Sequence, residues 1–334
     1  MEGKDWMNCN KTTVIGYLKL IVYLIIITII LVFFYFQRHR LSILTDISGF
    51  PLIVLLLIGL LPVYFNALSF KINISIFDVN LKFREWFGLS VINTFYNYIF
   101  PVRAGIAVRM GYMKTQYGFP VSSYLGFLTG SYLLVFFTSA LTASLVSVYL
   151  FFFSKPFKIE FLFASTGVMA GVLIFSFFLI KLKSLPISEK GKIKGFLQRL
   201  ANSFQFFKFN KNILKYIVLC KFFFILAMTL RLYASYWVLG IEISCIKLLL
   251  VSSFVVLSTF VSIVPGNLGI REGIIGLLTN IMGLPLEDAM LGALLDRAVA
   301  MILIFTLGVL FHFLLFGHDP SKNIYYSGKM NVQK

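Results

Sequence analysis

Long apolar runs constrain the fold of this chain more than any other feature of its sequence. A helix needs about 20 mostly apolar residues to cross the hydrocarbon core of a bilayer. The runs that meet this requirement are Val14–Phe36, Phe50–Phe70, Val121–Phe153, Phe161–Ile180, Tyr216–Leu239 and Pro285–Phe316. Because 59% of the residues are hydrophobic and only 13% are charged, one soluble core cannot bury all of these runs. We therefore predict an all-α, polytopic membrane protein with about six spans.

Two further apolar runs are too short for this scheme. One covers Trp86–Phe100 and the other covers Leu248–Val264, and a proline ends each of them. A second helical stretch follows each proline. Non-helical backbone at membrane depth is tolerated only where protein or a watery cavity surrounds it. We therefore expect two re-entrant helical hairpins, residues 86–117 and 248–282, each of which enters the membrane, turns and leaves on the same side.

The sequence at the end of each short run breaks helical structure. The two breaks share a Pro-xxx-Gly spacing, and their helix-breaking residues are Pro101, Gly105, Pro265, Gly266 and Gly269. Interrupted apolar segments at corresponding places in two halves of a chain are typical of a transporter's binding site. We therefore expect the two breaks to meet near the middle of the membrane and to form one site.

The distribution of lysine and arginine predicts the orientation. Residues 181–215 contain nine basic residues and one acidic residue, which indicates a cytoplasmic loop. Counting outward from this loop places both termini in the cytoplasm, with 20 basic residues inside and five outside. The positive-inside rule thereby explains the net charge of +17, and no nucleic-acid partner is implied. The expected location is the cytoplasmic membrane.

This orientation makes the two halves of the chain inverted copies of one pattern. The first hairpin enters from the cytoplasm and the second from outside, and each hairpin lies between two spans. We therefore expect a single membrane domain, residues 1–334, in which residues 14–153 form the first half and residues 216–317 form the second.

Two arginines flank the first break. Arg103 and Arg109 are six residues apart, so in a helix they lie on different faces and need not contact the same ligand group. Either they bind a headgroup, or they are ordinary anchors on the positively charged side of the membrane.

Charged residues also follow the second break, on the side where basic residues are scarce. Arg271 and Glu272 are adjacent and do not face each other in a helix. The last span adds Asp296 and Arg297, and charges at this depth usually face a partner or a cavity. In one arrangement Arg271 pairs with Asp296, and Glu272 pairs with Arg297. In others one arginine stays free for an anion, or the cluster is purely structural.

Arg231 is a lone basic residue inside the fifth expected span. The sequence leaves its role open between a snorkelling residue, an interhelical contact and a ligand.

The helix that restarts after each break offers a further reason to expect an anion. Its first N–H groups are unpaired and carry the positive end of the helix dipole, and such ends bind phosphate or carboxylate. Asn97 and Asn267 add amide groups near the breaks. The second break is the stronger candidate, because topology does not explain Arg271. The scattered cysteines and histidines have no metal-ligand spacing, so neither a metal nor a cofactor is expected.

The residues at both breaks resemble a known family. Asn97-Tyr-Ile-Phe-Pro-Val-Arg-Ala-Gly-Ile-Ala-Val-Arg109 is similar to the Asn-xxx-Pro-x-Arg-x-Gly-xxx-Arg signature of the lysylphosphatidylglycerol synthase transmembrane, flippase-like family. Pro265-Gly-Asn-Leu-Gly-Ile-Arg-Glu272 resembles that family's Pro-Gly-Gly-Leu-Gly-Val-Arg-Glu segment. The last span, with Arg297 and Gly308, is similar to the family's closing helix. The chain ends soon after that span, without the soluble aminoacyltransferase domain of full-length synthases, so lysyl transfer is not expected.

The breaks and the resemblance together predict a translocator for a membrane lipid with an anionic or lipid-linked polar headgroup, and no catalytic residue is expected. The expected substrate-binding residues are Asn97, Arg103, Arg109, Asn267, Arg271, Glu272, Asp296 and Arg297. One alternative is a non-catalytic membrane partner of an envelope glycan- or lipid-modifying transferase. Another is a scaffold in which the charged cluster only locks the packing.

Overall fold

All regular structure in the described part of the chain is helical. The computed structural model describes residues 49–77, 79–100, 103–154, 159–184, 211–259 and 265–316. Its elements are α3 (Gly49–Ser75), α4 (Phe83–Ile99), α5 (Ala104–Tyr117), α6 (Val121–Phe153), α7 (Glu160–Ser184), α9 (Lys211–Val238), α10 (Cys245–Ser258), the 3-10 turn η1 (Pro265–Asn267), α11 (Ile270–Ile281) and α12 (Leu286–Phe316). The predicted all-α class is confirmed.

Five of the predicted spans correspond to helices. Among the described helices, α3, α6, α9 and α12 are long and apolar enough to cross a membrane. The predicted span Phe161–Ile180 lies within α7. The first predicted span, Val14–Phe36, lies outside the described residues, as do residues 185–210 of the predicted cytoplasmic loop.

The outer surface of the helical bundle is strongly apolar. Phe152, Phe163 and Phe313 expose 69%, 68% and 66% of their surface. Lipid tails are as apolar as these side chains, so a bilayer covers such a surface without cost, whereas water does not. The apolar surface and the long apolar helices together identify a multi-pass membrane protein.

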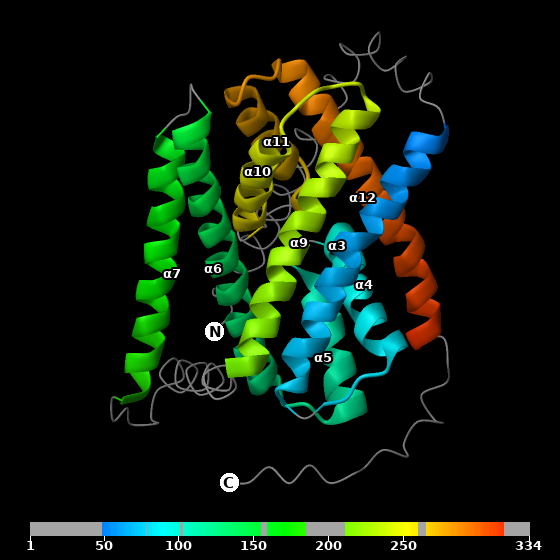
Figure 1. The fold of residues 1–334 in the computed structure, drawn as a ribbon. Coiled ribbons are helices and arrows are strands. Elements are labelled where there is room, and N and C mark those ends of the chain that lie inside the picture. The colour runs from blue at the N-terminus through cyan, green and yellow to red at the C-terminus, as the bar shows by residue number, and fades with distance from the viewer. Residues whose placement is uncertain are drawn as a thin grey trace, which may run out of the picture.

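The two predicted hairpins are present as two pairs of contacting helices, α4 with α5 and α10 with α11. Figure 1 shows the first pair in the lower half of the bundle and the second pair in the upper half, so the hairpins enter from opposite ends. The first arm of the second hairpin is shorter than predicted, because α10 ends at Ser258 and not at Val264. Residues 260–264 lie outside the described part of the chain.

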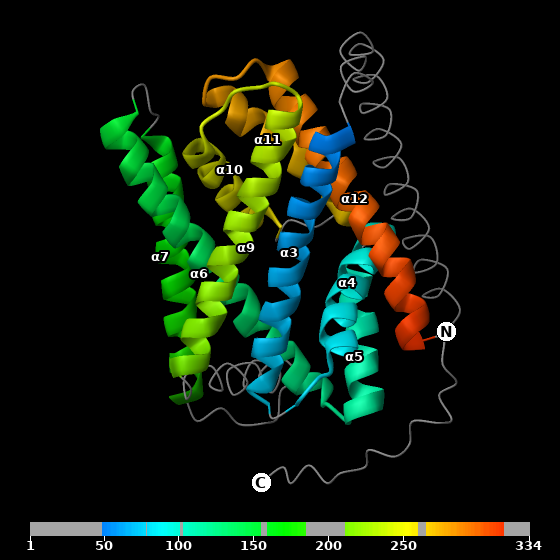
Figure 2. The same cartoon turned by 45° about the vertical axis from the view of Figure 1, so that its right-hand side comes forward.

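The two halves of the bundle repeat one arrangement in opposite directions (Figures 1 and 2). The order of α3, the α4–α5 hairpin and α6 recurs as α9, the α10–α11 hairpin and α12. The contacts follow the same relation: α3 packs along α9, while α4 packs on α12 as α10 packs on α6. This inverted arrangement brings the inner ends of both hairpins to the middle of the molecule. The remaining helix, α7, packs on α6 at one side.

Candidate functional site

A cavity of about 280 Å³ lies between the inner ends of the two hairpins. Its walls come from the long helices α3, α6, α9 and α12, from the hairpin helices α4, α10 and α11, and from η1. Four arginines line it, together with both asparagines expected near the breaks: Arg103, Arg231, Arg271, Arg297, Asn97 and Asn267. The cavity therefore contains most of the site residues predicted from the sequence.

The two break regions contact each other at this cavity. A terminal nitrogen of Arg103, from the first break, donates a hydrogen bond to the backbone carbonyl of Thr259, which follows α10. The Arg103 guanidinium also lies 5.0 Å from the centre of the Tyr132 ring of α6. Helix α4 packs directly on η1. The convergence of the breaks is therefore confirmed for the described residues, although Pro101 itself lies outside them.

At the first break the chain reverses direction, and the two arms of the hairpin, α4 and α5, pack closely against each other. Arg103 precedes α5 in a left-handed conformation, with φ of 55°. The backbone N–H of Gly105 donates to Oδ1 of Asn97 at 2.9 Å, so an amide of α4 caps the start of α5. A Cβ atom at Gly105 would collide with the carbonyl oxygen of Asn93. Glycine is therefore required at this position by packing, and the helix-break assignment of Gly105 has a steric cause.

The second break turns the chain through several left-handed residues. Gly266, Asn267 and Gly269 have φ values of 58°, 56° and 80°. Glycine adopts this conformation easily, and asparagine adopts it more readily than most other residues. The backbone N–H of Gly269 donates to Oε2 of Glu272 at 2.8 Å, so a carboxylate caps the start of α11. A negative charge at a helix N-terminus also interacts favourably with the helix dipole.

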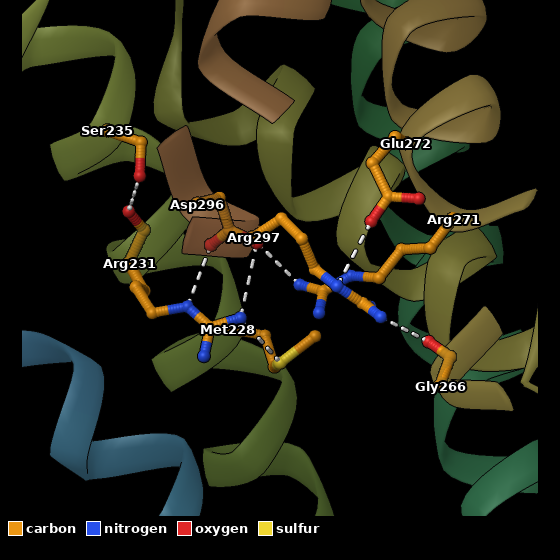
Figure 3. A network of polar contacts seen from close by, with 8 residues as sticks. All are labelled: Met228, Arg231, Ser235, Gly266, Arg271, Glu272, Asp296 and Arg297. Carbon is orange, nitrogen blue, oxygen red and sulfur yellow. Dashed lines mark hydrogen bonds and ion pairs between the residues drawn. The ribbon is translucent and has the colours of Figure 1, made fainter. Parts of the chain in front are cut away.

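Asp296 is the centre of a buried ion-pair network (Figure 3). Its Oδ1 accepts from Nε of Arg231 at 2.7 Å, and its Oδ2 accepts from Nη2 of Arg271 at 2.6 Å. A second bond joins Nη2 of Arg231 to Oδ2 at 3.2 Å. The Asp296 side chain has no exposed surface, so its charge is stabilised by these two guanidinium groups and not by water.

Arg297 is held by three groups from the two hairpins. Its Nε lies 3.4 Å from Oε1 of Glu272, an ion pair without hydrogen-bond geometry. Its Nη2 donates to the carbonyl of Gly266 at 2.6 Å, and its guanidinium lies 4.5 Å from the centre of the Tyr98 ring. Of the arrangements that the sequence left open, the one with the pairs Arg271–Asp296 and Glu272–Arg297 is thus present.

Among the described residues around the cavity, the positive charges outnumber the negative ones. Arg231, Arg271 and Arg297 share two carboxylates, and Arg103 adds a further positive charge at the cavity wall. Among the described residues, neither Glu272 nor Asp296 lines the cavity. The Arg271 Nε and the Asn267 Oδ1 are buried without a hydrogen-bond partner. A small anion with hydroxyl groups could satisfy both the excess positive charge and these polar atoms.

Arg109 is the one predicted substrate-binding residue of the described chain that lies apart from this network and the cavity. Its Nε donates to the Tyr124 hydroxyl at 2.5 Å, and its guanidinium lies 4.4 Å from the centre of the Phe70 ring. The structure therefore separates Arg103 from Arg109, as their spacing of six residues predicts. Whether any of these residues binds substrate stays a prediction.

Arg231, Tyr98 and Tyr132 reach the cavity without having been predicted there. The sequence could have indicated the position of Arg231, because a charge inside an apolar span needs a partner and Asp296 lies in another span. The aromatic residues had none, because aromatic residues are frequent throughout this chain. Among the described residues, no group of three or more His, Cys, Asp or Glu side chains could hold a metal ion.

The sequence matches the family described as the lysylphosphatidylglycerol synthase TM region over residues 19–308. The match includes both hairpins and every residue of the arginine-lined cavity. No curated protein matches the sequence. Because the match covers most of the chain, the protein belongs to the lysylphosphatidylglycerol synthase transmembrane-region family.

Proposed function

We propose that this protein moves a lipid with an anionic, phosphate-bearing headgroup across the cytoplasmic membrane, with both chain termini in the cytoplasm. The observation that carries the proposal is the cavity between the oppositely entering hairpins, which four arginines line and no carboxylate lines among the described residues. Guanidinium groups bind phosphate through charge-assisted, often bidentate hydrogen bonds. Family membership supports a role with membrane lipids.

The size of the cavity supports binding of a headgroup and not of a whole lipid. At about 280 Å³ it is slightly smaller than typical small-molecule pockets of about 300–1,000 Å³. Two acyl chains do not fit into it, so they stay in the bilayer while the polar headgroup passes through the protein. The sequence has no phosphate-binding loop of the Walker type, so movement is driven by the lipid gradient or by an ion.

In this proposal, a phosphate can replace Asp296 as the partner of Arg271. It shares Asp296 with Arg231, which keeps two hydrogen bonds to the same carboxylate. A phosphate in the cavity can therefore take over Arg271 while Arg231 still neutralises Asp296. Arg103, held by the Thr259 carbonyl and the Tyr132 ring, approaches the same cavity from the first hairpin.

Reconstitution into liposomes with fluorescent phosphatidylglycerol tests the proposal. The protein is expected to speed the movement of labelled lipid between leaflets, measured by quenching of the outer leaflet. Arg103→Gln and Arg271→Gln are each expected to slow this movement about tenfold, because a hydrogen bond to a charged group contributes about 1.5–3 kcal/mol. Arg84→Gln is the matched control, since Arg84 is exposed at the start of α4.

Two results would count against translocation. If lipid moves between leaflets no faster with wild-type protein than in protein-free liposomes, over several lipid compositions, the proposal is wrong. Co-purification with a transferase, together with loss of its product in Arg271→Gln and normal lipid distribution, would favour a non-catalytic partner of that transferase.

A further inference from the structure

The arginine-lined cavity has a second chemical feature, a wall of amide and hydroxyl groups from the first half of the chain. The residues of this wall are Asn66 of α3 and Ser90, Thr94 and Asn97 of α4. The three residues of α4 follow one another at intervals of four and three, so they share one face of the helix. Helix α3 packs on α4. We call these residues the amide–hydroxyl wall.

Hydrogen bonds within the protein fix the orientation of this wall. The amide nitrogen of Asn66 donates to the Ser90 hydroxyl at 3.3 Å, and the Thr94 hydroxyl donates to the Ser90 carbonyl at 3.1 Å. The Oδ1 of Asn97 accepts from the backbone N–H of Gly105 at 2.9 Å. Both amides are therefore oriented before a ligand binds, which lowers the entropic cost of binding.

The wall offers hydrogen-bond acceptors to a ligand, and not only donors. The Thr94 proton is used on the Ser90 carbonyl, so the Thr94 oxygen can only accept from a ligand. The amide nitrogen of Asn66 is turned to Ser90, which leaves its Oδ1 as an acceptor. The Oδ1 of Asn267, a cavity residue that is only 8% exposed, has no hydrogen-bond partner among the described residues. The cavity therefore matches a ligand that donates hydrogen bonds as well as accepting them.

A phosphodiester group does not meet this requirement by itself. Its oxygens are ionised at neutral pH and only accept, so they match the four arginines of the cavity but not the oxygens of the wall. The donor beside the phosphate is then either an amine or a hydroxyl group. An ammonium ion in this cavity would be repelled by four guanidinium groups, whereas a hydroxyl group is neutral. The combination of arginines and uncharged acceptors therefore favours hydroxyl groups.

The corresponding helices of the second half do not repeat the amide–hydroxyl wall. In the inverted arrangement α9 takes the place of α3, and α10 takes the place of α4 (Figure 1). Apart from Arg231, the residues of α9 and α10 at the cavity are Phe224, Met228 and Val255. A pocket with an apolar surface and a few fixed polar groups orients its ligand. A headgroup with C–H and hydroxyl groups would thus be turned with its hydroxyls toward α3 and α4.

We propose that the amide–hydroxyl wall selects the headgroup, and that the lipid is one whose phosphate carries a polyol such as glycerol, inositol or a sugar. The phosphate binds the arginines, while hydroxyl groups of the polyol donate to Asn66 and Thr94. This inference rests on the proposed function for the presence of a lipid headgroup in the cavity. Its own claim is selectivity of binding, which is measurable without transport. A soluble polyol phosphate shares the recognised chemistry, so the test includes one.

The test compares phosphatidylglycerol with phosphatidylpropanol, which has the same charge and the same phosphodiester but lacks the headgroup hydroxyls. Binding of each lipid to the purified full chain in detergent is measured by native mass spectrometry. The wild type is expected to bind phosphatidylglycerol about tenfold more tightly, because the analogue leaves the acceptors of the wall unpaired. Equal affinities would overturn the inference. Tighter binding of phosphatidylethanolamine than of phosphatidylglycerol would overturn the choice of hydroxyl groups over amines.

Two variants test the wall itself. Thr94→Val and Asn66→Leu keep the approximate size of the side chain and remove the acceptor. Each is expected to weaken binding of phosphatidylglycerol about two- to tenfold, the range for one neutral hydrogen bond, with phosphatidylpropanol unchanged. Thr94→Ser should keep the preference. If the two variants keep the wild-type ratio of the two affinities, the wall does not select the headgroup.

Thr166→Val is the matched control for Thr94→Val. Thr166 is also half-buried, and its hydroxyl likewise donates to the carbonyl four residues earlier, but no described residue of its helix, α7, lines the cavity. It should leave both affinities unchanged. A variant that fails to fold loses both lipids together, whereas loss of selectivity changes their ratio. The comparison of the two lipids in the wild type needs no variant.

The outcomes separate this inference from the proposed function. If wild-type protein moves lipid but binds and moves phosphatidylglycerol and phosphatidylpropanol alike, the selectivity is wrong and translocation stands. If it moves no lipid but binds phosphatidylglycerol selectively, the selectivity stands and translocation is wrong. If glycerol monophosphate binds in a Thr94-dependent way and phosphatidylglycerol does not bind, the lipid assignment is wrong.

Discussion

The two hairpins meet at one cavity, but they are held there by different chemistry. At the first break, a neutral amide caps the new helix, through Asn97 and the N–H of Gly105. At the second break, the carboxylate of Glu272 caps the N–H of Gly269. At their breaks, the first hairpin is thus capped by a neutral amide and the second by a charged carboxylate.

This difference changes the interpretation of the two breaks as anion sites. The sequence favours the second break, because topology does not explain Arg271. The structure gives Arg271 a partner in Asp296 and places a carboxylate at the start of α11, so much of the positive potential there is already neutralised. The start of α5 carries a neutral cap, and Arg103 beside it contacts a carbonyl and an aromatic ring. The first break therefore stays a candidate for anion binding beside the second, and binding at either one stays a prediction.

The largest effect that distinguishes the two breaks is expected from Asp296→Asn. The amide cannot neutralise Arg231 and Arg271, and removing one partner from a buried ion pair costs about 3–5 kcal/mol. Denaturation in mixed micelles should show this loss in the free energy of unfolding. Glu242→Gln, at an exposed carboxylate before α10, is the matched control and should have no effect. Equal stability of Asp296→Asn and wild type would show that charge does not hold the second hairpin.

The pair of Glu272 and Arg297 is expected to give the next largest effect. Glu272→Gln keeps an acceptor for the Gly269 N–H but removes the charge opposite Arg297. We expect a loss of about 1–3 kcal/mol in the free energy of unfolding, because the buried Arg297 is left without its partner. The double variant Glu272→Gln with Arg297→Gln should recover part of that loss, and the recovered part measures the coupling of the two residues. Additive losses in the two single variants would mean that the 3.4 Å contact contributes no stability.

The sequence predicted the helices well because span length and apolar character are local properties. The bounds of α6 agree with the predicted run, and the short runs before Pro101 and Pro265 indicated both hairpins. The apolar run predicted for the first arm of the second hairpin extended to Val264, whereas α10 ends at Ser258. Hydropathy alone does not locate the end of a helix inside an apolar run.

The site was less predictable because its contacts are long-range. One of the arrangements that the sequence left open, with Glu272 paired to Arg297 and Arg271 paired to Asp296, is present. It could be named because few opposite charges lie in the apolar segments. Arg231 was left open, although it binds Asp296 across 65 residues of sequence. A carboxylate that neutralises two arginines at once has no local pattern. Only the inverted packing of α9 beside α12 brings them together.

Close packing at the first break predicts a smaller but clear effect for Gly105→Ala. The added Cβ would collide with the backbone of Asn93, which cannot rotate away, and overpacking of this kind typically costs about 1–3 kcal/mol. Gly111→Ala, later in α5, meets no atom within 4 Å and should stabilise the helix by about 0.5–1 kcal/mol. Thermal unfolding of the two variants should therefore shift in opposite directions. A shift in the same direction would contradict the close approach of α4 and α5.

The smallest effect is expected from Asn97→Ala, which removes the neutral cap of the first break. Loss of a helix cap costs about 1 kcal/mol, which is less than the loss expected for the ion pair in Glu272→Gln. Asn93→Ala is a demanding control, because Asn93 lies one turn earlier on the same helix and its Oδ1 has no hydrogen-bond partner. It should leave the free energy of unfolding unchanged, while Asn97→Ala lowers it. If Asn97→Ala instead lowers the free energy of unfolding as much as Glu272→Gln does, the neutral cap at the first break contributes as much stability as the buried ion pair at the second. The proposed difference between a neutral break and a charged break would then be wrong.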